Sequence, residues 1–199
     1  MVFTAASCLQ TPDGQQASLS VFTPGREGED APFGVWNARR VFKQSGFNAT
    51  NQTPGNRANN DFGIIALGTK NGKHIQDVVG AQGACFDCRN FDTSDNFQVF
   101  AYEREGEKPN RLNADCAPRT IFTDVVTGGP RFDCRDGRVL EKDADGSPLL
   151  AEVDPETGLG EVRGILNSRG FTEGPAMGGL FLATAQNEFF QQVDAAASR

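Results

Sequence analysis

The sequence predicts an all-β protein that closes with a single helix, and three observations support this prediction. Glycine and proline occur 23 and 10 times among the 199 residues, so the chain turns often. Short stretches of apolar or alternating residues recur between these turns, as is typical of β-strands. Apolar residues recur at helical spacing near the C-terminus, where Phe189, Phe190 and Val193 share one face. Repeated short strands with one terminal helix favour a β-barrel protein.

The predicted strands follow one another along the chain. The first lies in the opening "VFTAASCL", and the second alternates until Pro24 and Gly25 end it. A long polar loop follows the third strand, and Asp61 then leads directly into a continuous apolar strand. The predicted strands are residues 2–9, 17–25, 34–42, 61–69, 97–103, 148–150, 160–168 and 178–184, and the predicted helix covers residues 185–197.

The charge and the hydrophobicity of the chain exclude several classes of function. A net charge of −7 argues against nucleic acid or an anionic membrane as the partner. The chain has no apolar run near the ~20 residues that a membrane-spanning helix needs. No basic and then apolar leader precedes the first strand, so the chain starts abruptly. We expect either that a leader and the first strands are missing or that the gene begins here.

The five cysteines predict disulfide bonds rather than redox or metal chemistry. Cys85 and Cys88 form a CxxC motif, but a thioredoxin-like site would open a helix, and "GACFDCRNFD" is typical of a loop. A zinc site would need a second cysteine pair at similar spacing, which the sequence lacks. We therefore expect a structural disulfide or two plain thiols in the motif. Cys116 and Cys134 are the natural second disulfide, so Cys8 is left unpaired.

Residues suited to catalysis are few. The single histidine, His74, lies between charged residues in a turn-like segment and is expected at the surface. Asp61 heads an apolar strand, where it is either a turn cap or a half-buried carboxylate aimed into a cleft. Asp143 and Asp145 are spaced like the start of a calcium loop, but an apolar strand follows them at once. We therefore predict neither a metal nor a cofactor.

Taken in order, several segments resemble the trypsin-like (chymotrypsin-fold) serine proteases, in particular their secreted bacterial branch. The segment "FTAASC" resembles the T-A-x-H-C sequence of the catalytic histidine, and "NNDFGIIALG" resembles the N-D-x-A-x-L sequence of the catalytic aspartate. "DADGSPLL" resembles the G-x-S-G-G-P-x-L sequence of the nucleophile. "FGVWNARRVF", "GKHIQDVVGAQG", "GILNSRG" and "GPAMGGLF" resemble, in turn, a strand before the aspartate, the linker between the barrels, the substrate-binding strand and the closing segment.

The resemblance implies two six-stranded antiparallel β-barrels and a C-terminal helix. It divides the chain into an incomplete N-terminal barrel, residues 1–75, and a C-terminal barrel with the terminal helix, residues 76–199. The family's strands before the histidine segment have no counterpart here, and one of them carries the cysteine that pairs beside the histidine. The expected N-terminal truncation thus explains both the abrupt start and the unpaired Cys8, and it leaves an open edge on the first barrel.

The catalytic positions of the family are only partly kept. Ser7 stands at the histidine position, Asp61 at the aspartate position, and Asp145 at the nucleophile position. Asp143 replaces the glycine whose backbone N–H donates to the oxyanion. A serine hydroxyl cannot act as the base, and a carboxylate cannot become an activated alkoxide. Loss of a triad member typically costs roughly 10⁴- to 10⁶-fold in rate, so the usual proteolysis is expected to be absent.

We therefore predict a catalytically inactive protease homologue that binds a peptide or protein partner. The family's substrate-backbone strand corresponds here to Asn167, Ser168 and Arg169, which should lie with the triad positions between the two barrels. Two alternatives remain. One is a hydrolase in which Asp61 and Asp145 form an acid pair that activates water. The other is a truncated gene product without function. The resemblance further implies secretion to the extracellular space.

Overall fold

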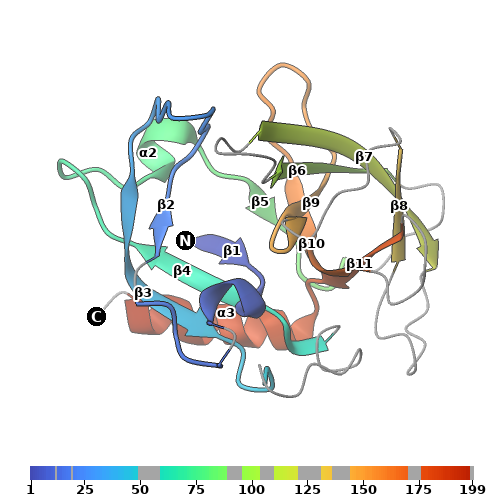
Figure 1. The fold of residues 1–199 in the computed structure, drawn as a ribbon, viewed down its shortest axis with the longest axis horizontal. Helices are drawn as coiled ribbons and strands as arrows, with labels where there is room; N and C mark the ends of the chain where they lie inside the picture. The colour runs from blue at the N-terminus through green and yellow to red at the C-terminus, as the bar shows by residue number, and fades with distance from the viewer. Residues whose placement is uncertain are drawn as a thin grey trace.

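The structure, a computed structural model, consists of two β-rich parts and a long C-terminal helix (Figure 1). It describes residues 1–11, 13–18, 20–48, 59–88, 96–103, 110–120, 131–135, 144–169 and 176–197. The strands of the first third of the chain lie on one side of the molecule, and β6 to β11 lie on the other. The predicted all-β class with a terminal helix is confirmed.

Four strands form an open antiparallel sheet in the order β1-β4-β3-β2. β4 is an inner strand, and most of it is buried because its sequence "GIIAL" is apolar without interruption. Within the described residues, β1 and β2 form the two edges, so the predicted first barrel is an open sheet of four strands. The bounds are β1 Val2–Thr4, β2 Val21–Phe22, β3 Trp36–Lys43 and β4 Gly63–Leu67.

Six strands close into a barrel in the order β11-β8-β7-β6-β9-β10, and β10 pairs back onto β11. Every pairing within this ring is antiparallel, as the resemblance implies. The short β5 adds to β10 in parallel. The bounds are β5 Gly83–Ala84, β6 Phe97–Glu103, β7 Asn110–Thr120, β8 Arg131–Arg135, β9 Pro148–Ala151, β10 Glu161–Arg169 and β11 Ala176–Phe181.

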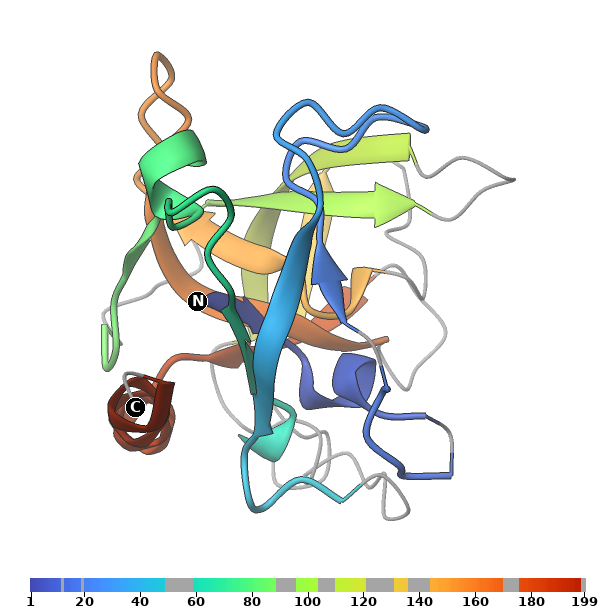
Figure 2. The ribbon, with the colours of Figure 1, turned by 90° about the vertical axis from the view of Figure 1, so that its left-hand side faces the viewer.

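Helical segments connect and cover these sheets. A 3-10 helix, η1 (Ala6–Leu9), follows β1, and the short α2 (Gln76–Val79) precedes β5. α3 (Thr184–Ala197) runs along β3 and β4 in Figure 1 and is seen end-on in Figure 2. Its Val193 is buried, and its Phe189 packs against the same apolar cluster. Among the described helices, none has the length and apolar character needed to cross a membrane.

Two clusters of buried side chains hold these parts together. The first fills the C-terminal barrel, and the second joins the N-terminal sheet, the outside of the barrel and α3. Alternation along the strands separates them, so in β9 Leu149 belongs to the barrel cluster and Leu150 to the joining cluster. The ring of Phe3 packs edge to face against Phe62 and Phe190 in the joining cluster. This packing fixes the sheet against the barrel, so side chains at their junction have defined positions.

Most strong apolar patterns become strands where the sequence predicts them. Residues 34–42, 61–69, 97–103, 148–150 and 160–168 correspond to β3, β4, β6, β9 and β10. The predictions for 178–184 and 17–25 are correct only in part, because β11 ends at Phe181 and β2 covers only Val21–Phe22. The predicted C-terminal helix is α3. The division of the chain between residues 75 and 76 stays a prediction.

The prediction for residues 2–9 is wrong in its second half. The chain leaves β1 after Thr4 and turns into η1, because the Cys8 N–H donates to the Ala5 carbonyl at 3.1 Å. The same turn directs the Ser7 N–H to Asp61 at 2.6 Å. A hydrogen bond to a buried carboxylate thus takes the place of a strand ladder.

Two strands of the barrel, β7 and β8, are not predicted by the sequence. The segment of β7, "NRLNADCAPRT", is polar and contains Pro118, which weakens any strand signal. Its strand state comes from pairing with β6 on one side and β8 on the other. The register shifts between Pro118 and Thr120, a position where a missing backbone N–H is tolerated.

The structure shows the bonding state of four of the five cysteines, all except Cys134. Cys85 and Cys88 form a disulfide in a loop, as one of the two predicted states requires. Cys116 is disulfide-bonded, and the β7–β8 register places it opposite Cys134, whose side chain lies outside the described ones. Cys8 has a free thiol, as predicted.

Candidate functional site

The carboxylate of Asp61 is the centre of the candidate site. Asp61 precedes β4 and is 0% exposed. Its Oδ1 accepts the backbone N–H of Ser7 at 2.6 Å, and its Oδ2 accepts the Ser7 hydroxyl at 2.9 Å. Both carboxylate oxygens therefore accept a hydrogen bond from Ser7, and such bonds stabilise a buried carboxylate. Of the two predicted roles, the structure favours the buried carboxylate over the turn cap.

The turn that contains Asp145 lies between η1 and β10. The Gly146 N–H donates to the Leu166 carbonyl at 2.7 Å, and the Leu166 N–H donates to the Ser147 carbonyl at 2.9 Å. On its other side, the Cys8 thiol donates to the Asp145 carbonyl oxygen at 3.4 Å. Backbone contacts from two parts of the molecule therefore fix the position of Asp145.

Gly146 lets this turn approach β1 closely. Its φ of +88° lies in the left-handed region, which disfavours other residues. A Cβ on Gly146 would lie 2.5 Å from the Thr4 Oγ1 and 3.1 Å from the Ala5 backbone nitrogen. The glycine therefore serves both the turn and the close packing of the turn against the N-terminal sheet.

The surroundings of Cys8 raise the pKa of its thiol. Cys8 is exposed when the whole residue is considered, but the protein around its thiol keeps water away from the sulfur. This burial, followed by the nearby carboxylates of Asp145 and Asp61, raises the pKa of the Cys8 thiol from 9.0 to about 11. Ser7 bonds to Asp61, and the next residue, Cys8, bonds to the Asp145 carbonyl, so the structure brings Ser7, Asp61 and Asp145 together at one place. Their roles as triad positions stay predictions.

The remaining predicted site residues fall into three groups. Asn167 is 1% exposed in β10, directly after Leu166, whose backbone holds the Asp145 turn. Ser168 and Arg169 continue β10, but their side chains lie outside the described ones, and Asp143 lies outside the described residues. The cysteines Cys85, Cys88 and Cys116 belong to disulfides in other parts of the molecule.

The candidate site contains no histidine. The single histidine of the chain, His74, is exposed in the turn before α2, where its backbone N–H donates to the Asp77 carboxylate. The Ser7 hydroxyl beside Asp61 donates a hydrogen bond to the carboxylate. The Cys8 thiol stays protonated because its pKa is raised.

Two other features lie apart from the site. A cavity of about 190 Å³ is lined by residues of β6, β7 and β9, including Gln98, Asp115 and Leu150, and by none of the site residues. The Sγ atoms of Cys85 and Cys88 lie with a carboxylate oxygen of Glu161 in a group of metal-ligating type. No motif in the sequence indicates Glu161, because it lies in β10, far along the chain from the two cysteines.

Comparisons with known proteins identify the fold. No protein-family model matches the chain, and no curated protein matches it in sequence. Solved structures do match. Protease Anisep from Arthrobacter nicotinovorans is 19% identical with a TM-score of 0.71, covering 97% of this chain and 82% of that one.

Two further solved structures are similar to the same extent. The thermostable serine protease AL20 from an extremophilic microorganism is 17% identical with a TM-score of 0.70, covering 96% of this chain and 82% of that one. A Glu endopeptidase in complex with MPD is 19% identical with a TM-score of 0.71, covering 97% and 80%. The similarity extends over nearly the whole chain at low identity. The protein therefore has the trypsin-like (chymotrypsin) serine protease fold.

Proposed function

We propose that this protein is a catalytically inactive homologue of the trypsin-like serine proteases that binds a peptide or protein partner outside the cell. One observation carries the proposal: Ser7 occupies both oxygens of the buried Asp61, where the resembling proteases place the catalytic base. The carboxylate is kept, and the base that it would orient is replaced by the Ser7 hydroxyl, which donates a hydrogen bond to it.

Three deficits act against acyl transfer at this site. The base position holds a hydroxyl, the nucleophile position holds the Asp145 carboxylate, and the adjacent Cys8 thiol is neutral at physiological pH. Base and nucleophile act as one unit in such enzymes, so their losses do not multiply, but either loss alone costs roughly 10⁴- to 10⁶-fold. Hydrolysis by the usual mechanism should therefore fall to the level of background.

The scaffold around the lost chemistry supports a binding role. Gly146 keeps the close approach of its turn to β1, and the turn keeps its hydrogen bonds to β10. The Asp61 charge remains buried with hydrogen bonds to Ser7, which avoids the several kcal/mol that an unsatisfied buried charge costs. A site with fixed backbone and low catalytic power is suited to holding a peptide between the two β-rich parts. The disulfide at Cys85 and Cys88 supports an oxidising, extracellular location.

Hydrolysis of a panel of fluorogenic peptides tests the inactivity. We expect no turnover by the purified protein above a buffer blank. The double variant Ser7→His with Asp145→Ser tests whether the triad positions are the only loss, and the single variant Asp145→Ser is its matched control. Turnover by the unmodified protein contradicts the proposal.

The same assay tests the acid-pair hydrolase. Asp61 accepts the Ser7 N–H, and the Asp145 carbonyl accepts the thiol of the next residue, Cys8, which supports the two aspartates as neighbours. If the unmodified protein hydrolyses peptides and Asp145→Asn abolishes this, the acid pair replaces the proposed function. If the unmodified protein hydrolyses peptides and Asp145→Asn hydrolyses them at the same rate, the acid pair is excluded as well.

Selection of peptides from a display library tests the binding role. Peptides bound at the proposed place should lose affinity in Asp145→Lys. The control Glu188→Lys makes the same charge change on the exposed side of α3 and should leave affinity unchanged. Equal affinity for both variants would place the binding elsewhere and contradict the proposal.

A further inference from the structure

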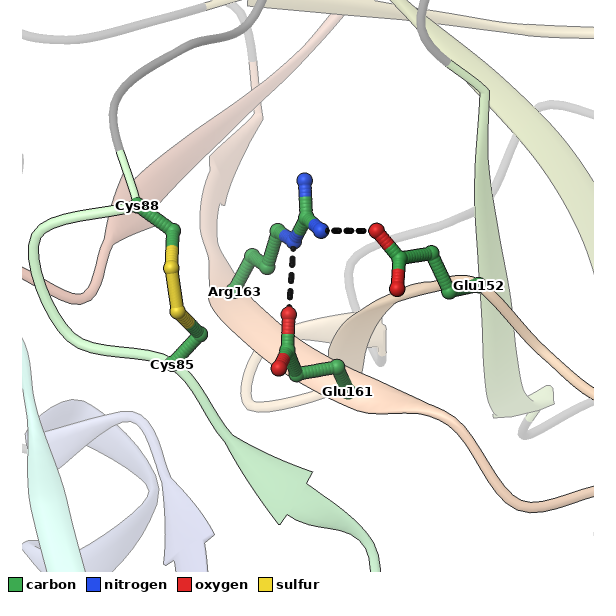
Figure 3. A network of polar contacts seen from close by, with 5 residues as sticks. All are labelled: Cys85, Cys88, Glu152, Glu161 and Arg163. Carbon is green, nitrogen blue, oxygen red and sulfur yellow. Dashed lines mark hydrogen bonds and ion pairs between the residues drawn. A yellow bond between two sulfur atoms is a disulfide. The ribbon is translucent and has the colours of Figure 1, made fainter.

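The loop that contains Cys85 and Cys88 lies against β10, on the side chain of Glu161 (Figure 3). The two Sγ atoms and one Glu161 carboxylate oxygen all lie within 4.8 Å of one another. Two thiolates and a carboxylate are the ligand types that Zn²⁺ takes in proteins, and a C-x-x-C spacing is common in its sites. In the disulfide form these sulfurs are bonded to each other, so they cannot serve as ligands.

The backbone of this loop is held by contacts that do not involve the disulfide. β5 pairs with β10 in the register Gly83 to Glu161, and the Cys85 N–H donates to the Val162 carbonyl at 3.0 Å. These bonds hold the backbone of Cys85 against β10 irrespective of the redox state of its sulfur.

The other end of the loop is attached to the start of α3. The Asp87 N–H donates to the Leu182 carbonyl at 2.8 Å. The Asp87 carboxylate accepts the Thr184 N–H at 2.9 Å and the Thr184 hydroxyl at 2.8 Å. Between these anchors, the ring of Phe86 packs against Phe190 with centroids 5.6 Å apart. After reduction, the two sulfurs therefore remain close to each other and to Glu161.

The charges nearby suit a divalent cation. The Arg163 Nε donates to Glu161 at 3.1 Å, and another nitrogen of its guanidinium donates to Glu152 at 2.5 Å (Figure 3). Two thiolates, one carboxylate and one divalent cation carry a net charge of −1. Arg163 and its second partner, Glu152, neutralise each other and leave this net charge unchanged, while the bond from Arg163 keeps the Glu161 carboxylate beside the sulfurs. Cys85, Cys88 and Glu161 are all partly exposed, so a water molecule can complete a four-coordinate site.

We propose that reduction of the Cys85–Cys88 disulfide converts this loop into a zinc site with Cys85, Cys88 and Glu161 as ligands. A dithiol supplies the two electrons and two protons that turn the disulfide into two thiols, and the dithiol itself becomes a disulfide. Binding of Zn²⁺ then releases two protons from the thiols to solvent. The absence of a second cysteine pair does not exclude zinc here, because the pairing of β5 with β10 supplies the third ligand. The inference does not rest on peptide binding, and it concerns a reducing environment, unlike the extracellular location proposed above.

Cobalt titration of the reduced protein tests the proposal. The experiment uses the full chain with Cys8→Ser, which removes the other free thiol. The protein is reduced by a water-soluble phosphine, which becomes its oxide by taking the oxygen of water. Alkylation and intact mass verify that two thiols have formed and that buried Cys116 stays bonded. We expect one Co²⁺ per chain with thiolate charge-transfer absorption, displaced by Zn²⁺, and no such absorption in the folded, oxidised protein.

Paired variants test the ligand set. Cys85→Ser should abolish the charge-transfer bands of a bound two-thiolate site. Glu161→Gln should lower the affinity for the metal by at least roughly 10- to 100-fold. Loss of a residue that only hydrogen-bonds to a ligand already lowers metal affinity by roughly this factor. Glu152→Gln is the matched control, because Glu152 shares the Arg163 ion pair but lies outside the three ligands, and it should change affinity less than threefold. Absence of binding after reduction, or equal effects of Glu161→Gln and Glu152→Gln, overturns the proposal.

Discussion

Replacing Gly146 by alanine tests the contact that brings the Asp145 turn against the N-terminal sheet. Gly146 has a φ of +88°, and Gly158, in an open turn, has a φ of +69°. Alanine at either position is forced into the left-handed region, which costs about 1–2 kcal/mol. Only at Gly146 does the new Cβ meet other atoms, the Thr4 Oγ1 at 2.5 Å and the Ala5 nitrogen at 3.1 Å, whereas Gly158 has nothing within 4 Å.

The difference between the two variants isolates the packing at the site. A contact of this length forces a shift of the turn or of β1, and overpacking of this kind typically costs about 1–3 kcal/mol more. We therefore expect unfolding free energies lower by about 1–2 kcal/mol for Gly158→Ala and by about 2–5 kcal/mol for Gly146→Ala. Urea unfolding followed by the fluorescence of Trp36, the only tryptophan and buried in β3, measures both. Equal losses in the two variants would refute the close approach of Gly146 to β1.

Two further predictions concern the same site. Asp61→Ala should lower the free energy of unfolding by about 2–4 kcal/mol, because the Ser7 N–H and hydroxyl lose a charged acceptor in a buried place, and Asp61→Asn should cost less because its amide oxygen still accepts one of them. A loss below 1 kcal/mol in urea unfolding of Asp61→Ala would contradict this. Because the Cys8 pKa is raised from 9.0 to about 11, its alkylation by iodoacetamide at pH 8 should be about tenfold slower than that of an ordinary thiol, after allowance for the greater nucleophilicity of the thiolate. The neutral thiol is favoured in the folded protein, so this contribution to stability is complete below pH 9.0 and is lost as the pH rises through about 11. Asp145→Asn should speed the alkylation, and a rate that already levels off near pH 9 would contradict the raised pKa.

The parts of the fold that the sequence predicts are those with strong local signals. The uninterrupted apolar run after Asp61 and the clean alternation of residues 97–103 become β4 and β6, since burial of one or both faces decides their state locally. β7 carries no such signal, because its polar sequence is held as a strand by its neighbours. The turn at Ser7 is likewise set by a distant partner, the Asp61 carboxylate.

The candidate site divides in the same way. The order of the short segments was enough to predict that Ser7, Asp61 and Asp145 belong together, because each stands in a motif of the resembling family. The contact of Cys8 with the Asp145 carbonyl could not be predicted, since it depends on how two β-rich parts pack. The approach of Glu161 to the CxxC loop depends in turn on the parallel pairing of β5 with β10.

Labelling with a serine-directed fluorophosphonate tests the central claim of inactivity most directly. The probe reacts covalently only where a serine is activated by a base, so it requires no knowledge of the substrate. Intact mass of the unmodified protein after exposure should show no adduct, while an active trypsin-like protease in the same buffer is labelled completely. A single adduct mapped by peptide mass to Ser7, which bonds to Asp61, or to Ser147, which closely follows Asp145 in sequence, would contradict the account.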